Sequence, residues 1–137
     1  MSSRNGTDRS GLPGIAGVGA AVPEKVLTNA DLEKLVNTSD EWITTRTGIK
    51  ERHVLGETED PTDLAVKASK QALDQAGLTP NDIDFVITAT NLGSMPIPGS
   101  SPFIIEGLGV GKDIPFFDLL AGCSGFIYSL KVAADLI

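Results

Sequence analysis

The chain is organised around one stretch, residues 116–128, which reads Phe116-Phe117-Asp118-Leu119-Leu120-Ala121-Gly122-Cys123-Ser124-Gly125-Phe126-Ile127-Tyr128. The apolar run from Ile114 to Leu120 predicts a buried strand. Small residues follow, and an apolar pattern with helical spacing begins at Phe126. Cys123, the only cysteine of the sequence, is therefore expected at a strand-to-helix turn, next to a helix N-terminus.

Such a turn favours a reactive thiol. The unpaired amides at a helix N-terminus carry partial positive charge that stabilises an anion, so the nucleophilic thiolate of Cys123 should be favoured. Gly122 and Gly125 allow a sharp turn and close approach of a substrate, as in the nucleophile elbow of serine hydrolases. The alternative is that Cys123 is an inert, buried small hydrophobe, as free cysteines often are.

Composition excludes several classes of function. The 137 residues suffice for one domain, and 41% of them are hydrophobic, which is ordinary for a globular chain. Eighteen acidic and eleven basic residues give a net charge of −7, which argues against a nucleic-acid partner. A single cysteine forms no internal disulfide, and neither a metal-ligand cluster, a membrane span nor a secretion signal is visible. We therefore expect no metal and a cytoplasmic location.

The order of predicted elements indicates an α/β fold with a largely parallel sheet covered on both faces. Three strands are expected, at Gly14–Val22, Phe85–Thr90 and Ile114–Leu120, and Ile49–Leu55 is expected as a short exposed strand. The glycines of the first strand do not have the spacing of a dinucleotide-binding loop. Residues 1–12 are expected to be a disordered extension of the domain formed by residues 13–137.

Helix starts and stops are clear in the sequence. Capping boxes are expected at Thr28–Asp31 and at Thr38–Glu41, Asp60 is an N-cap before Pro61, and a fourth helix opens at Ser101. Gly48, Gly77 and Gly109 are expected to end three of these helices. The last helical pattern runs to Ile137 without a C-cap, so the domain is expected to be incomplete there.

Four motifs in order give the chain a family resemblance. They are Thr28-Asn29-Ala30-Asp31-Leu32-Glu33, Thr38-Ser39-Asp40-Glu41-Trp42-Ile43, Arg46-Thr47-Gly48-Ile49-Lys50-Glu51-Arg52-His53 and Ala121-Gly122-Cys123-Ser124-Gly125-Phe126. Together they closely resemble β-ketoacyl-acyl-carrier-protein synthase III. The resemblance runs from about Gly14 to Ile137 and covers roughly the first 40% of such an enzyme, judged from the usual size of two-domain chains.

The resemblance implies the N-terminal half of a thiolase-like fold, layered αβαβα in the complete enzyme, and a homodimer. It implies an acyltransferase that condenses an acyl-CoA starter with malonyl-acyl-carrier protein and initiates type II fatty acid synthesis. Coenzyme A would enter as a thioester substrate, with no cofactor. A histidine and an asparagine from a C-terminal half, absent from these residues, would assist.

The same resemblance assigns site residues. Cys123 matches the nucleophile that takes the acyl group, Trp42 the aromatic that stacks on the adenine, Thr38 a neighbour of that base, and Arg46 a basic contact for the nucleotide. One helical turn separates Trp42 from Arg46, so both should project from one face. The alternative is that Trp42 is a half-buried core aromatic. His53 is expected to be a structural or surface residue, since no positioned partner is visible.

Two positions depart from the family pattern. Gly122 stands where alanine is more frequent, and Ile97 stands where many members carry a phenylalanine that closes the partner subunit's acyl pocket. A smaller Ile97 would leave a longer or wider pocket, so a polyketide starter synthase or a head-to-head acyl-condensing enzyme stays open. A non-catalytic assembly module is the alternative outside enzymes. The 137 residues alone are expected to be inactive.

Overall fold

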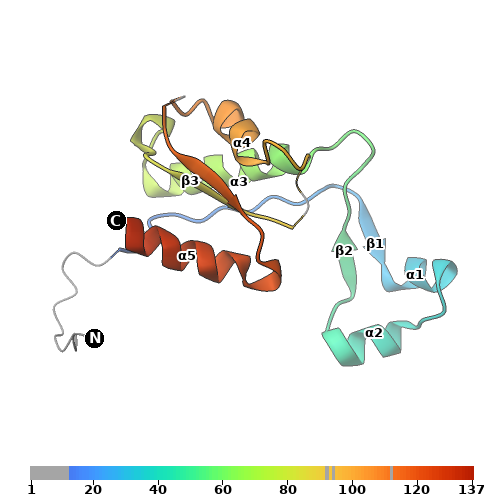
Figure 1. Cartoon of the computed structure of the whole chain (residues 1–137). Helices are drawn as coiled ribbons and strands as arrows, with labels where there is room; N and C mark the ends of the chain where they lie inside the picture. The colour runs from blue at the N-terminus through green and yellow to red at the C-terminus, as the bar shows by residue number, and fades with distance from the viewer. Residues whose placement is uncertain (1–12, 92, 94, 112) are drawn as a thin grey trace, which may run out of the picture.

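The computed structural model describes residues 13–91, 93, 95–111 and 113–137. Residues 1–12, expected to form a disordered extension, lie outside this range. The described helices and strands form two bodies that follow each other in the chain (Figure 1). We call residues 23–55 the α1–α2 body and the described residues among 56–137 the α3–α5 body, and the closest packing is within each body.

The α1–α2 body is a two-stranded antiparallel sheet with two short helices. β1 (Val26–Thr28) pairs with β2 (Glu51–His53), with Leu27 opposite Arg52. Between the strands lie α1 (Asn29–Leu35) and α2 (Asp40–Thr47), which pack against each other. The exposed strand expected within Ile49–Leu55 is therefore present, shortened to three residues.

The α3–α5 body has three layers. β3 (Val86–Ala89) and β4 (Phe116–Leu119) form a parallel pair, joined through the crossover helix α4 (Ser101–Leu108). α3 (Pro61–Ala76) and α4 lie on one side of this pair and α5 (Gly125–Leu136) on the other (Figure 1). The short 3₁₀ helices η1 (Pro80–Asp82) and η2 (Gly122–Ser124) precede β3 and α5.

The helix signals of the sequence are largely confirmed. Thr28 and Asp31 form the expected capping box, and Asp60 caps α3 ahead of Pro61. The three glycines expected to end helices do so with left-handed backbone, where a side chain would be strained: Gly48, Gly77 and Gly109. One cap was wrong by a residue, because Ser39 rather than Thr38 accepts the Trp42 amide at the start of α2.

The expected first strand, Gly14–Val22, is wrong for the described residues. This segment runs along α3, where the amides of Val18 and Ala20 donate to the side-chain oxygens of Gln75 and Gln71, at 2.6 and 3.2 Å. A Cβ on Gly19 would lie 2.0 Å from the Ala68 carbonyl oxygen, so the backbone touches the helix directly. Side chains of α3 therefore accept the backbone amide hydrogen bonds that the carbonyl groups of a neighbouring strand would otherwise accept.

The other two strands lie where expected but are shorter and less buried. β3 and β4 each have four residues, and Phe116 and Leu120 are exposed rather than part of a buried strand. The described apolar core is small and centres on α4, with Ile104, Ile105 and Val110 buried. An apolar strand sequence is typical of a sheet covered on both faces, and although helices lie on both sides of β3 and β4, most residues of these strands are only half-buried. Among the described residues, no helix combines the length and apolar character needed to cross a membrane.

Candidate active site

Cys123 lies at a turn from strand to helix, as the sequence predicted. β4 ends at Leu119, Gly122 has φ +57°, and α5 begins at Gly125 immediately after η2. The thiol is free and exposed to solvent. The alternative of a buried cysteine therefore does not hold for this structure, and the sulfur is accessible.

Hydrogen bonds to the preceding strand and loop fix this turn. The Gly122 amide donates to Asn91 Oδ1 at 3.0 Å, and the Ser124 amide donates to the Ala121 carbonyl at 3.2 Å. Asn91 lies shortly after β3 and Cys123 shortly after β4, and the carboxyl ends of parallel strands share one edge of a sheet. Sequence reasoning missed Asn91, although its place just after a predicted strand was a usable signal.

Gly125 brings the first turn of α5 close to the sheet. It is buried, and a Cβ there would lie 3.3 Å from Ala89 Cβ and 3.9 Å from Leu119 Cδ2. Because glycine has no side chain, the helix start packs against the ends of both β3 and β4. This contact packs the start of α5, and Cys123 just before it, against the end of the sheet.

An apolar hollow of about 950 Å³ opens beside the thiol. Its walls come from β3 and α5, and they include Phe85, Ile87, Phe126 and Leu130 together with Cys123. Asp84 and Ser129 also line the hollow, but most of its lining is apolar, and a mainly apolar wall beside a nucleophile suits an acyl chain better than a charged ligand. The geometry therefore supports acyl transfer to sulfur.

A largely buried polar network joins β4 and β3 to the start of α4. Asp118 on β4 accepts hydrogen bonds from the amides of Ser100 and Ser101 and from the Ser101 hydroxyl. The Ser101 Oγ also lies 2.7 Å from Thr88 Oγ1 on β3, and the Thr88 hydroxyl donates to it, because the single Ser101 hydroxyl proton goes to Asp118. This network joins the start of α4 to both strands. Sequence reasoning missed it, because nothing in the pattern pairs Asp118 with a serine seventeen residues earlier.

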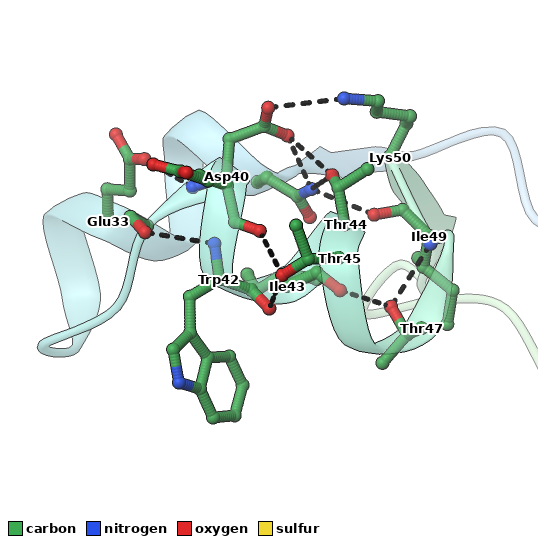
Figure 2. A network of polar contacts seen from close by, with 12 residues as sticks. Glu33, Asp40, Trp42, Ile43, Thr44, Thr45, Thr47, Ile49 and Lys50 are labelled. Carbon is green, nitrogen blue, oxygen red and sulfur yellow. Dashed lines mark hydrogen bonds and ion pairs between the residues drawn. The ribbon is translucent and has the colours of Figure 1, made fainter.

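Trp42 and Arg46 project from one face of α2, as predicted from their spacing. The Arg46 Cζ lies 4.5 Å from the centroid of the Trp42 ring, within the range of a cation–π contact. Trp42 is 53% exposed and is not among the buried residues of the described apolar core. Figure 2 shows its ring pointing away from the polar contacts of α2. Thr38 is half-buried, just before the Ser39 cap.

The structure does not bring all predicted residues together. Cys123 belongs to the α3–α5 body and Trp42 with Arg46 to the α1–α2 body, and none of the described contacts joins them. In Figure 1 the N-terminal end of α5 faces the side on which the α1–α2 body lies. Ile97 is 85% exposed and does not line the hollow at Cys123. His53 is exposed, with Nδ1 2.6 Å from the Pro23 carbonyl oxygen.

Comparison with curated proteins finds close sequence relatives. The chain is 49% identical over 124 residues to the β-ketoacyl-[acyl-carrier-protein] synthase III of Caldanaerobacter subterraneus, a match that covers 90% of this chain and 37% of the relative. The chain thus spans well under half the length of the curated relatives it matches. No protein-family model matches the chain.

Solved structures agree with the sequence relatives. The 3-oxoacyl-[acyl-carrier-protein] synthase III of Aquifex aeolicus superposes with a TM-score of 0.84 at 47% identity, over 89% of this chain and 39% of that one. The priming β-ketosynthase of the R1128 polyketide pathway gives 0.83 at 35% identity, over 90% and 36%. The predicted thiolase-like fold is confirmed, and the chain forms a portion of it.

Proposed function

We propose a function on the premise that this chain is homologous, over 90% of its length, to the β-ketoacyl-[acyl-carrier-protein] synthase III enzymes. The proposed activity is condensation of an acyl-CoA starter with malonyl-acyl-carrier protein, which initiates type II fatty acid synthesis. These residues would supply the nucleophile and the nucleotide-binding face. A further part of the protein would supply the histidine and asparagine that the resemblance implies, in a cytoplasmic homodimer.

The observation that carries this proposal is the position of Cys123. Its exposed thiol stands at a sheet edge, before a helix N-terminus and beside an apolar hollow. In the proposed first half-reaction the sulfur attacks the thioester carbonyl, the bond from that carbonyl to the coenzyme A sulfur breaks, and the coenzyme A thiol leaves. A carbanion formed by loss of CO₂ from the malonyl thioester then attacks the carbonyl of the acyl-cysteine, the bond from that carbonyl to the Cys123 sulfur breaks, and Cys123 leaves as the thiolate. Covalent catalysis of this kind divides one difficult step into two easier ones.

The α1–α2 body would hold the other end of the substrate. Trp42 offers an exposed flat ring and Arg46 a planar cation, which suits a base and a phosphate. Thr38 precedes the cap of the same helix and would neighbour the base. The coenzyme A thioester is a substrate in this scheme, and no cofactor takes part.

The test is acylation of Cys123. The full-length protein is incubated with a short acyl-CoA and its intact mass is measured. We expect a mass increase of one acyl group, lost in Cys123→Ser. An unmodified protein, or equal modification of the Cys123→Ser variant, would contradict the proposal.

A second candidate is a priming role in polyketide synthesis. It is favoured by the likeness to the R1128 priming β-ketosynthase and by Ile97, which is smaller than the phenylalanine implied at this position. A panel of acyl-CoA substrates of increasing length separates the two. Strong preference for acetyl-CoA would count against the wider pocket, and efficient use of longer chains would favour it.

A further inference from the structure

The α1–α2 body contains one almost fully buried polar side chain, Asn29. It is the first residue of α1 and is 2% exposed. Its Nδ2 donates to Asp40 Oδ1 at 2.7 Å and to the Ile49 carbonyl at 2.8 Å, and its Oδ1 accepts from Arg52 at 2.7 Å. One amide therefore links α1 to α2, to the residues after α2, and to β2.

Asp40, the first residue of α2, receives most of this network. Its Oδ1 accepts from Asn29 and from Thr44 Oγ1, its Oδ2 pairs with Lys50 at 3.2 Å, and its amide donates to Glu33 Oε1 at 2.7 Å (Figure 2). The hydrogen bond from Asn29, followed by that from Lys50, holds the pKa of Asp40 below its ordinary value. The carboxylate is thus kept charged and oriented.

Apart from its packing against α1, α2 is held among the described residues mainly by this polar network. None of its residues is buried, so an apolar face does not set its orientation as it does in most surface helices. The polar contacts at its first turn and at Ile49, just after its end, are what fix its rotation and position. Trp42 comes two residues after Asp40, on the side turned away from the network (Figure 2).

We propose that Asn29 is a positioning residue for the nucleotide end of a coenzyme A thioester. Through Asp40 and the Ile49 carbonyl it sets the orientation of α2, and α2 presents Trp42 and Arg46 to the nucleotide. This inference rests on the proposed function. Asn29 itself does not touch the substrate, so its effect should depend on whether the substrate carries a nucleotide.

The experiment compares two thioesters in the full-length protein. Acyl-CoA carries the adenine nucleotide, and the acyl-pantetheine thioester of the same acyl group does not. For Asn29→Ala we expect KM for acyl-CoA to rise about tenfold, the equivalent of one well-placed interaction, with kcat within about twofold. With acyl-pantetheine, kcat/KM should stay within about twofold of the value for the unmodified protein. This substrate has no nucleotide, so a weaker nucleotide contact cannot change its binding.

Two further variants control this result. Asp40→Asn keeps an acceptor oxygen for Asn29 Nδ2 and should raise KM for acyl-CoA less than about threefold, since only the exposed pair with Lys50 is lost. Asn81→Ala removes an exposed asparagine in η1, outside the α1–α2 body, and should change neither substrate. If Asn29→Ala does not fold, the same comparison is made with Asn29→Ser, which keeps one hydrogen-bonding group.

An equal decrease in kcat/KM of Asn29→Ala with both thioesters would overturn the inference, because it would show a general structural role. An unchanged kcat/KM of Asn29→Ala with both thioesters would overturn it as well. If the unmodified protein turns over neither thioester, the proposed function fails. The inference is then tested by measuring how tightly coenzyme A binds to each protein. Coenzyme A should then quench the emission of Trp42, the only tryptophan of these residues, about tenfold more weakly in Asn29→Ala. Absence of quenching in the unmodified protein, or equal affinity in both, would overturn it.

Discussion

Asp118 on β4 caps the first turn of α4 through Ser101. The carboxylate accepts the Ser101 amide at 2.9 Å and also the Ser101 hydroxyl, and Ser101 is fully buried. Buried donors that lose their acceptor keep the cost of desolvation. The link therefore holds the crossover helix against the strand that leads to Cys123.

Replacing Asp118 tests this link. Asp118→Ala should lower the free energy of unfolding by about 2–3 kcal/mol, because the amides of Ser100 and Ser101 lose their acceptor without gaining water. Urea unfolding of the full-length protein measures it. Asp113→Ala, at an exposed position shortly before β4, is the matched control and should change stability by less than about 0.5 kcal/mol. Equal effects of the two substitutions would show that the network adds nothing.

Gly122 should resist substitution despite the alanine that the resemblance suggests there. With φ at +57°, an added Cβ costs about 1–2 kcal/mol, although there is open space around it. We expect Gly122→Ala to lose about that much stability and to alter the rate at which iodoacetamide alkylates Cys123. Gly111→Ala is the control, since its Cβ also meets open space and its φ is not in the left-handed region. An unchanged Gly122→Ala protein would show that the turn relaxes freely.

Acid should loosen the α1–α2 body first. The hydrogen bond from the Thr28 side chain, followed by that from Lys34, lowers the pKa of Asp31, and Asn29 and Lys50 lower that of Asp40. A folded-state pKa below the unfolded value of about 3.9 stabilises the fold above that pH, and this stabilisation is lost as pH falls through the folded-state values. Trp42 emission followed downward from pH 6 should therefore change below about pH 4.

The control for the acid transition is a variant without the titrating groups. Asp31→Asn combined with Asp40→Asn should be less stable than the unmodified chain at pH 6 and should show a flatter pH dependence. A transition of the same size and midpoint in this double variant would mean that other carboxylates control the acid response.

Arg46 should strengthen nucleotide binding by Trp42. Because the guanidinium lies 4.5 Å from the ring centroid, it both stacks on the ring and offers a cation to phosphate. Arg46→Ala should weaken quenching of Trp42 by coenzyme A about tenfold, and Arg46→Lys, which keeps the charge without the planar fork, by less. Pantetheine, which lacks the nucleotide, should quench neither protein. Equal binding of pantetheine and coenzyme A would contradict a nucleotide site at α2.

The sequence was most informative where structure is local. Helix caps and helix stop signals depend only on neighbouring residues, so their patterns locate helices well. Here they are the caps at Thr28 and Asp60 and the stops at Gly48, Gly77 and Gly109. The same holds for Cys123, whose turn is defined by residues next to it. Spacing alone placed Trp42 and Arg46 on one face.

Contacts between distant residues could not be predicted in this way. Asn29 reads as an ordinary helix-starting residue, yet its amide meets Arg52 twenty-three positions later. Gly14–Val22 has the apolar character of a strand, but whether such a segment joins a sheet depends on the strands beside it. In the described residues its amides go to Gln71 and Gln75 instead.

The 137 residues alone should self-associate and should not condense substrates. Apolar side chains are exposed along α5 and at the end of β4, with Phe126 64% and Leu120 71% exposed, and contiguous apolar surface of this kind drives association. Proton transfer by a positioned side chain typically contributes ~10²–10⁴-fold to the rate, and the implied histidine and asparagine are not among these residues. Size exclusion should give a species larger than 14.3 kDa, and Leu120→Lys with Ile127→Lys should shift it toward that mass. A soluble monomer with cooperative thermal unfolding would contradict the first expectation, and ketoacyl product from acyl-CoA and malonyl-acyl-carrier protein would contradict the second.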